Sequence, residues 1–364
     1  MAAPQALLTS TQDAATSRLA ALDLPAAVPE GCVRVAVRRV SLTTNNVTYA
    51  LFGERMQYWR FFPSGEAGWG IVPAWGYGEV VASTLPELAV GERLYGYWPL
   101  AECVDLQPQR VSAASFVDGA AHRVELNPVY NRYLRCAADP GYRAADESAL
   151  AVVQPLFGTA FLLADFIVDN ACFGAQRVVL SSASSKTAYA TVWCLRDAGG
   201  PPCVALTSAA NAGFVRRLGL YDAVLDYAQI ESLAPDVPTV FCDFSGNASQ
   251  RERLHRRLGD ALRYSAVIGA TQFAEPTGDD KLPGAKPIFF FAPDQARQRA
   301  QTWGAAELAR RVGEAQRRFV AQALDGAEPW LSLVEHRGLA AGGELLRTLA
   351  QGRVDPSLGH VLAL

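Results

Sequence analysis

The feature that most restricts the fold is an alternation of short apolar segments with helical segments between residues 155 and 270. The apolar segments have the length and β-branched content of buried strands, and each is followed by a stretch whose apolar residues have helical spacing. Strands separated by helices form parallel βαβ units. The alternation therefore predicts an α/β domain with a doubly wound parallel sheet of the Rossmann type. Its predicted strands are 177–182, 203–208, 223–227, 239–246 and 264–270.

The length of 364 residues exceeds what one ordinary hydrophobic core supports, so two domains are expected. The N-terminal part alternates apolar and polar residues in short runs interrupted by Gly and Pro, which is typical of twisted strands joined by tight turns. We predict a β-rich substrate domain over 1–154 and a dinucleotide-binding domain over 155–285. The C-terminal segment 286–364 is expected to return to the first domain.

Composition excludes several classes of function. A net charge of -3 provides no basic stripe for a phosphate backbone, so nucleic acid is not an expected partner. No run of 18 apolar residues and no signal-like N-terminus is present, so we expect a cytoplasmic protein that does not bind membranes. The seven cysteines are scattered without a CxxC pair, which indicates reduced, mostly buried thiols.

The turn after the first predicted strand of the α/β domain is the first place to look for a ligand. Here the sequence is VVLSSASSKTAYA, which lacks the glycines of a GxGxxG turn but offers small residues, hydroxyls and one cation. A plain Ser-capped helix start stays open as the alternative. A phosphate-binding P-loop would need glycines where Leu180 and Ser185 stand, so it is excluded. The candidate cofactor-binding residues of the turn are Ser182, Ala183, Ser184, Ser185, Lys186 and Thr187.

The end of the second strand distinguishes the two nicotinamide cofactors. NAD enzymes place an acid there for the ribose 2′-hydroxyl, whereas NADP enzymes supply hydroxyls or cations. This chain has no acid there and offers Thr207, Ser208 and Asn211, with Lys186 and Arg216 as cationic partners. The sequence therefore predicts NADP(H), although an arginine that only solvates a helix face is the alternative for Arg216.

Several motifs together resemble the medium-chain dehydrogenase/reductase superfamily, especially its zinc-independent quinone and enoyl reductases. RRLGLYDAVLDY at 216–227 is the most specific match, and it is similar to the superfamily's L-G-A-D-x-V-I-D-Y segment. SLTTNNVTYALFGE at 41–54, WGYGEVVAS at 75–83, VGERLYGY at 90–97 and PLFGTAFLLAD at 155–165 also have counterparts. More closely still, LTSAANAGF, the SSASSKTA turn and FFFAPDQ resemble the family of domains of unknown function DUF2855.

The resemblance implies a GroES-like fold for the β-rich domain and adds candidate cofactor contacts. These are Thr159, Tyr227, Gly246 and Gly269. The chain also departs from the superfamily, because ASSKTA replaces its glycine-rich turn and Thr48 stands at the position of its active-site Asp. The resemblance therefore supports fold and cofactor better than it supports one reaction.

A zinc site is not expected. The four histidines lie at no ligand-like spacing from a cysteine, and Gly76-Tyr77-Gly78-Glu79 replaces the GHE motif of zinc enzymes. We therefore predict no metal among the site residues.

The predicted reaction is reduction of an activated double bond or carbonyl in an enone, enoyl thioester or quinone, because NADPH delivers hydride to the electrophilic carbon of these groups. The oxyanion that develops must be stabilised and protonated. Tyr49 is the first candidate for this role, with Asn45 four residues earlier as its polar partner. Tyr130 and Tyr133, in a segment at 127–142 expected to be an inserted loop or short helix, and Trp75 are candidate contacts for a small apolar or acyl substrate.

One alternative of a different class stays open. The altered turn and the missing Asp are also compatible with an NADPH-binding protein that has no redox turnover and serves a regulatory, binding or lyase-like role. A homodimer likewise stays open.

Overall fold

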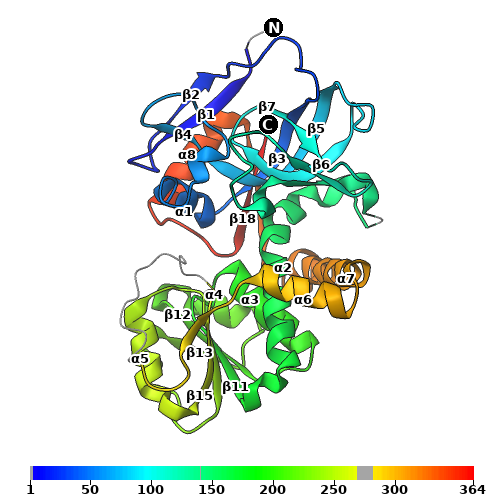
Figure 1. Cartoon of the computed structure of the whole chain (residues 1–364). Coiled ribbons are helices and arrows are strands. Elements are labelled where there is room, and N and C mark those ends of the chain that lie inside the picture. Colours follow the sequence, from blue (N-terminus) through cyan, green and yellow to red (C-terminus); the bar gives the residue numbers. More distant parts are fainter. Residues whose placement is uncertain (1–2, 140, 269–281) are drawn as a thin grey trace. The chain divides into compact units, whose positions relative to one another are not determined.

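The computed structural model describes residues 3–139, 141–268 and 282–364. The chain divides into two compact units, of which unit 1 comprises residues 1–152 and 331–364 and unit 2 comprises 153–330 (Figure 1). The division falls within helix α2 (Glu147–Asp169). Each unit is described by itself.

Unit 2 contains the doubly wound sheet that the sequence predicts. Its six strands are all parallel, in the order β13-β12-β11-β14-β15-β16. The order reverses between β11 and β14, and such a switch point leaves a crevice at the carboxyl ends of the strands. The strands are β11 (Arg177–Leu180), β12 (Cys203–Thr207), β13 (Ala223–Asp226), β14 (Thr239–Asp243), β15 (Leu262–Val267) and β16 (Pro287–Phe289).

Helices cover both faces of this sheet, as Figure 1 shows with α5 on one side of the strands and α6 and α7 on the other. On the α5 side, Leu254 and Leu258 pack against Val179 and Phe241 in one buried cluster. On the other side, Phe319 of α7 contacts the aromatic rings of both α2 and α3. The helices are α3 (Lys186–Asp197), α4 (Ala212–Arg217), α5 (Ala248–Leu258), α6 (Ala292–Thr302) and α7 (Ala305–Asp325).

Unit 1 is the predicted β-rich unit. Its larger sheet has nine strands, in the order β17-β18-β3-β5-β6-β10-β9-β8 with β7 paired to β3, and a second sheet has the order β2-β1-β4. In the first sheet they are β3 (Val33–Leu42), β5 (Pro73–Ser83), β6 (Arg93–Pro99), β7 (Cys103–Leu106), β8 (Pro108–Gln109), β9 (Ser115–Asp118), β10 (Arg132–Arg135), β17 (Ser332–Arg337) and β18 (Leu358–Ala363). In the second they are β1 (Gln5–Ser10), β2 (Ser17–Ala21) and β4 (Trp69–Ile71).

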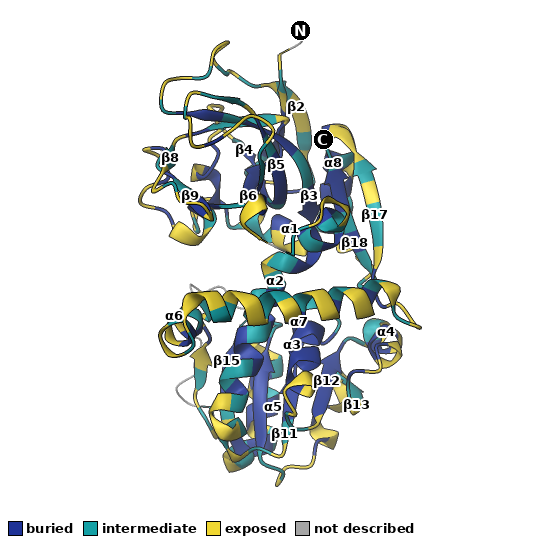
Figure 2. Cartoon of the chain, turned by 90° about the vertical axis from the view of Figure 1, so that its right-hand side faces the viewer, coloured by how far each residue is buried: buried dark blue, intermediate teal, exposed yellow. Residues whose placement is uncertain are grey.

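The core of unit 1 lies between the strands and two helices, α1 (Thr44–Leu51) and α8 (Gly338–Ala350). Figure 2 shows the buried residues concentrated on the inner strands, among them β3 and β5. Where β3 and β5 pair, a Cβ added at Gly76 would lie 2.0 Å from the carbonyl oxygen of Arg39, so only glycine fits there.

Three sequence predictions about organisation need correction. Residues 287–330 belong to unit 2 and not to the first domain, because β16 pairs with β15 and α7 packs on α3. The chain returns to unit 1 only at Leu331. The segment 127–142 contains short helices, as expected, in the 3-10 turns Pro128–Asn131 and Cys136–Ala138, but it also contains β10, which pairs with β6 and β9. The domain boundary predicted at residue 155 falls inside helix α2, which begins at Glu147 and contains Pro155.

One helical stretch, Ala144–Asp169, is long and apolar enough to cross a membrane by length and composition alone, with a mean hydropathy of 1.8. Half of that window is buried within the protein, and core helices of soluble proteins meet the same criterion.

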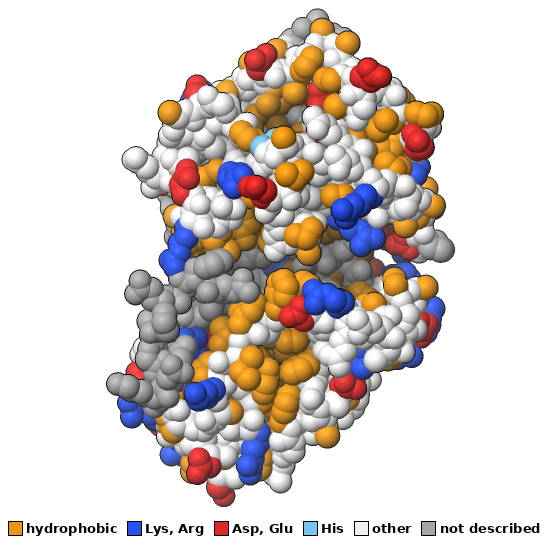
Figure 3. All heavy atoms as spheres, in the orientation of Figure 1, with side chains coloured by type: hydrophobic (Ala, Val, Ile, Leu, Met, Phe, Trp, Pro, Cys, Tyr) orange, Lys and Arg blue, Asp and Glu red, His pale blue; other side chains and the backbone are white. Residues whose placement is uncertain are grey.

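The described part of unit 2 also exposes apolar side chains next to β16, where Ile288, Phe289 and Phe291 are 50%, 37% and 37% exposed. Figure 3 shows apolar side chains gathered on this face.

Candidate functional site

The turn after β11 is tight although it lacks glycine. Ser182 adopts a φ of 46°, in the left-handed region that favours glycine. Its backbone N–H donates to the hydroxyl of Tyr227 at 2.9 Å, and the N–H of Ala183 donates to the carbonyl of Leu206 at 3.1 Å. Two of the predicted cofactor residues, Ser182 and Tyr227, are thus brought together.

Helix α3 begins directly after this turn. Ser185 is its N-cap, and its hydroxyl accepts from the N–H of Ala188 at 3.3 Å. Lys186 and Thr187 are the first two helical residues, at the end where the helix dipole favours anions. The capped helix start that the sequence left open is therefore present, and it is compatible with a phosphate at the same helix end.

Asp243, at the end of β14, is the residue that sequence reasoning missed. Its side chain is fully buried, and one carboxylate oxygen accepts from the Ser181 hydroxyl at 2.7 Å and from the N–H groups of Ser245 and Gly246 at 3.0 and 3.1 Å. The other oxygen pairs with Arg251 at 2.9 Å. The carboxylate therefore ties the loops after β11 and β14 together at the switch point. Because Arg251 neutralises it, it places no uncompensated negative charge beside a phosphate.

The hydroxyl of Ser181 completes this clip. It accepts from the N–H of Phe244 at 2.9 Å and of Ser245 at 3.0 Å while it donates to Asp243. An acidic residue directly after a run of buried strand residues, TVFCD, was the available sequence signal, since a buried charge needs a specific partner.

The end of β12 carries the predicted NADP-discriminating residues. Thr207 is 1% exposed, and within the described ranges its hydroxyl has no hydrogen-bond partner. Ser208 caps the following turn, and Asn211 donates from its side-chain amide to the Ser184 hydroxyl at 3.0 Å. The adjacent strand ends at Asp226, whose carboxylate accepts from the N–H of Ala228 and caps a 3-10 helix. A partnerless buried hydroxyl is uncommon and points to an additional polar group at this edge.

The remaining candidates of unit 2 are more scattered. Thr159 lies half-buried on α2, and Gly246 has a φ of 64° in the loop that Asp243 holds. Arg216 is exposed near the end of α4, as expected of a solvating charge. Gly269 lies outside the described residues.

In unit 1, the structure brings three predicted residues together in a cluster of aromatic rings, which we call the tyrosine cluster. Tyr49, on α1, lies 4.5 Å from Tyr58 between ring centroids and 5.8 Å from Tyr97. Tyr130 and Trp75 join through Tyr97, at 4.7 and 5.0 Å. The hydroxyls of Tyr58 and Tyr130 are 3.4 Å apart.

Burial controls the chemistry of this cluster. It raises the pKa of the Tyr49, Tyr58 and Tyr97 phenols well above the usual range, because the phenolate would be poorly solvated. These hydroxyls therefore stay protonated at neutral pH and can donate hydrogen bonds to an oxyanion.

Asn45 and Tyr49 lie one turn apart on α1, but they differ in environment. Asn45 is exposed, and the neighbouring Asn46 is the buried amide that fixes the helix. Its side chain accepts from the Thr43 N–H at 2.7 Å and donates to the Pro73 carbonyl at 2.8 Å. The structure thus anchors Tyr49 through Asn46.

Tyr133 does not belong to an accessible site, which corrects the sequence prediction. Its ring is fully buried, and its hydroxyl donates to the carbonyl of Tyr97 at 2.8 Å and accepts from Arg123 at 3.0 Å. Strand β10 turns Tyr133 into the core, whereas Tyr130, in the turn before it, faces the tyrosine cluster. Trp59 and Trp98 are likewise core residues.

Residues 3–139, 141–268 and 282–364 contain no group of three His, Cys, Asp or Glu side chains that could hold a metal ion. All seven cysteines are free. Glu79, in the segment that replaces GHE, pairs with Arg93 at 3.2 Å. Independence from zinc stays a prediction.

Comparison with known proteins now places the chain. The model of the family described as "Protein of unknown function (DUF2855)" matches residues 40–355. The chain is a member of the DUF2855 family. No curated protein shows a significant match to it.

Solved structures show that this DUF2855 protein has the fold of medium-chain reductases, a GroES-like and a Rossmann unit. The CurF ER cyclopropanase from the curacin A biosynthetic pathway is similar with a TM-score of 0.63 and 16% identity, covering 100% of this chain and 99% of that one. CurA from Vibrio vulnificus in complex with NADPH has a TM-score of 0.62 and 14% identity, with 99% of both chains covered. The yhdH oxidoreductase from Salmonella enterica in complex with NADP has a TM-score of 0.55 and 16% identity, with 99% of both covered.

Proposed function

We propose that this DUF2855 protein binds NADP(H) at the carboxyl edge of the unit 2 sheet and reduces an activated double bond or carbonyl. The observation that carries the proposal is the clip of Ser181 and Asp243, which holds the loops after β11 and β14 at the switch point where doubly wound sheets bind their ligands. Two structural neighbours are NADPH and NADP complexes, which supports the choice of cofactor.

The donors at this edge fit a phosphorylated dinucleotide. The first turn of α3 presents the helix end, Lys186 and Thr187, and the hydroxyls of Ser184 and Ser208 lie on the adjoining loops. The partnerless hydroxyl of Thr207 adds a polar atom at the end of β12, and no carboxylate follows that strand before Asn211. This donor set favours a 2′-phosphate over a free 2′-hydroxyl.

When bound, NADPH supplies the hydride. The chain's contribution to the chemistry is assigned to the tyrosine cluster, where the Tyr49 hydroxyl donates to the oxygen that gains negative charge. Its raised pKa keeps the proton in place before the reaction. Trp75 and Tyr130 offer flat apolar surface for an enone, quinone or acyl group, and both are partly exposed.

Two measurements on the full chain test the proposal. Calorimetric titration with NADPH and NADH is expected to show binding with preference for NADPH. NADPH oxidation across enones, quinones, aldehydes and enoyl thioesters is expected to show turnover of at least one class without added metal. Absence of binding by both cofactors, or a clear NADH preference, refutes the cofactor assignment.

A second candidate is NADPH binding without redox turnover. The observation that favours it is the turn after β11, where the N–H groups of Ser182, Ala183 and Ser185 already donate to acceptors within the protein and not to a ligand. One structural neighbour is named a cyclopropanase, so the fold does not by itself select reduction. Cofactor binding with no oxidation of NADPH by any compound of the panel would establish this candidate.

The assembly, partners and location of the protein are proposals made from its sequence. We expect a cytoplasmic protein with a small-molecule substrate and neither nucleic acid nor a membrane as partner. The apolar side chains exposed beside β16 support a homodimer, which light scattering on the purified chain tests.

A further inference from the structure

A cavity of about 510 Å³ lies in unit 1, and the proposed function does not use it. Its walls come from β1, β2 and the residues after β2, from the segment around Phe61, from the start of β7 and from the loop after β9. A volume of this size is within the range of small-molecule sites. All of its lining residues belong to unit 1, so the cavity is complete within that unit.

The walls are mainly apolar and are held from behind. The larger apolar side chains among the lining residues are Leu8, Leu22, Leu24, Phe61, Phe62 and Ile71. The guanidinium of Arg123 lies 4.8 Å from the ring centroid of Phe62 and 5.5 Å from that of Phe61. Arg123 is itself fixed by Asp118 at 2.8 Å and Asn131 at 2.9 Å. The aromatic wall is therefore preformed, which lowers the entropy lost when a ligand binds.

Four carboxylates line the cavity, and three of them are neutralised by arginines. Asp105 pairs with Arg34 at 2.7 Å, Asp118 pairs with Arg123 at 2.8 Å, and Glu66 pairs with Arg18.

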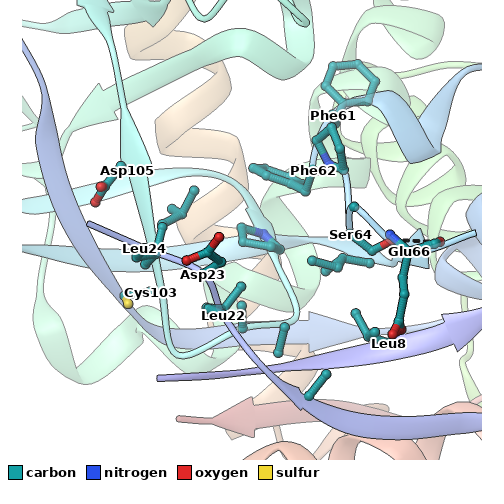
Figure 4. Close-up of a pocket in the computed structure, with 18 of the residues that line it drawn as sticks. Leu8, Leu22, Asp23, Leu24, Phe61, Phe62, Ser64, Glu66, Cys103 and Asp105 are labelled. Carbon is teal, nitrogen blue, oxygen red and sulfur yellow. Dashed lines mark hydrogen bonds between the residues drawn. The ribbon is translucent and has the colours of Figure 1, made fainter. Parts of the chain in front are cut away.

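Asp23 is the exception, because no cation or hydrogen-bond donor is found for its carboxylate among the described residues. Asp23 is exposed to solvent, and Figure 4 shows it between Leu22 and Leu24. Burial lowers the pKa of the nearby His122, so this imidazole adds no positive charge at neutral pH. The cavity thus combines a mainly apolar surface with one solvent-exposed carboxylate that has no cation beside it among the described residues.

We propose that this cavity binds a small apolar molecule that carries a protonated amine. Its hydrocarbon part lies against Phe61, Phe62 and the leucines, and its ammonium group pairs with Asp23. Apolar contact supplies most of the affinity, and the ion pair supplies the preference for a cation over a neutral or anionic head group.

The probes are octylamine, octanol and octanoate, titrated calorimetrically into the full chain. Octylamine is expected to bind most tightly, octanol more weakly and octanoate least. A series from hexylamine to octylamine should gain roughly fourfold in affinity per methylene.

Two variants with matched controls locate the site. Asp23→Asn should weaken octylamine by about three- to fivefold and leave octanol unchanged, whereas Glu54→Gln, an exposed carboxylate of the same unit, should change neither. Ala20→Phe fills the cavity and should abolish binding of both compounds, whereas Leu19→Phe, on the opposite face of β2, should not.

Three results would overturn the proposal. These are no octylamine binding at millimolar concentration, equal affinity for octylamine and octanoate, or unchanged binding in Asp23→Asn or Ala20→Phe. Circular dichroism and urea unfolding show whether the Ala20→Phe protein is folded, because NADPH would report only on unit 2, and no step of this test depends on NADPH. Failure of this proposal and failure of the NADP(H) proposal are therefore distinguishable.

Discussion

Replacing Ser181 by alanine tests whether the clip at the switch point holds the two loops together. The change removes a 2.7 Å hydrogen bond to the Asp243 carboxylate, and it removes the acceptor of the Phe244 N–H at 2.9 Å. Ser245 keeps a second acceptor in Asp243 at 3.0 Å, so only one backbone amide loses its partner. A lost bond to a charged group and one unsatisfied amide together correspond to about 2–4 kcal/mol of unfolding free energy.

Urea unfolding followed by circular dichroism measures this loss, and calorimetry on the same variant measures the accompanying fall in NADPH affinity. Ser232→Ala is the matched control, because Ser232 is exposed and donates only to the carbonyl of Gln229. It should change stability by less than about 0.5 kcal/mol. A Ser181→Ala protein as stable as the control would show that the clip contributes nothing and would refute the reasoning.

Three further predictions follow from the structure. Lys186→Ala, at the first turn of α3, should weaken NADPH binding by about 10- to 150-fold in calorimetry, and unchanged affinity would contradict its proposed contact with phosphate. Tyr49→Phe should lower kcat with little change in NADPH affinity. Because the pKa of Tyr49 is raised, the parent protein should keep the Tyr49 proton between about pH 8 and 10, and a pH profile of turnover should show no fall there from its loss. Gly76→Ala should lower stability by about 3 kcal/mol or more in urea unfolding, because its Cβ would collide with the Arg39 carbonyl, whereas Gly158→Ala, with open space around it, should not.

The sequence predicted the sheet of unit 2 well, because alternation of apolar strands and helices is a local signal. It failed where the outcome depended on distant contacts. Residues 287–330 differ in composition from the strands and helices before them, so the sequence assigned them to the first domain. They belong to unit 2 because β16 pairs with β15, and no local sequence pattern predicts that pairing.

The site was predicted only in part, because the contacts between its residues join segments that are distant in the sequence. Ser182 and Tyr227 were identified separately as cofactor contacts, but only the structure shows that the Tyr227 hydroxyl holds the Ser182 amide. Asp243 was missed because its importance comes from what surrounds it. Tyr130 and Tyr133 were equal candidates in sequence, and the direction in which β10 faces separates them.

The discontinuity of unit 1 has a consequence for the order of events during synthesis. Strand β3 pairs with β18, and Leu42 lies opposite His360, which is synthesised more than 300 residues later. The ribosome makes all of unit 2 between these two strands. Unit 2 can therefore complete its sheet while residues 39–42 of β3 still lack their partner strand, and such an unpaired edge is prone to pair with other chains until β18 is made.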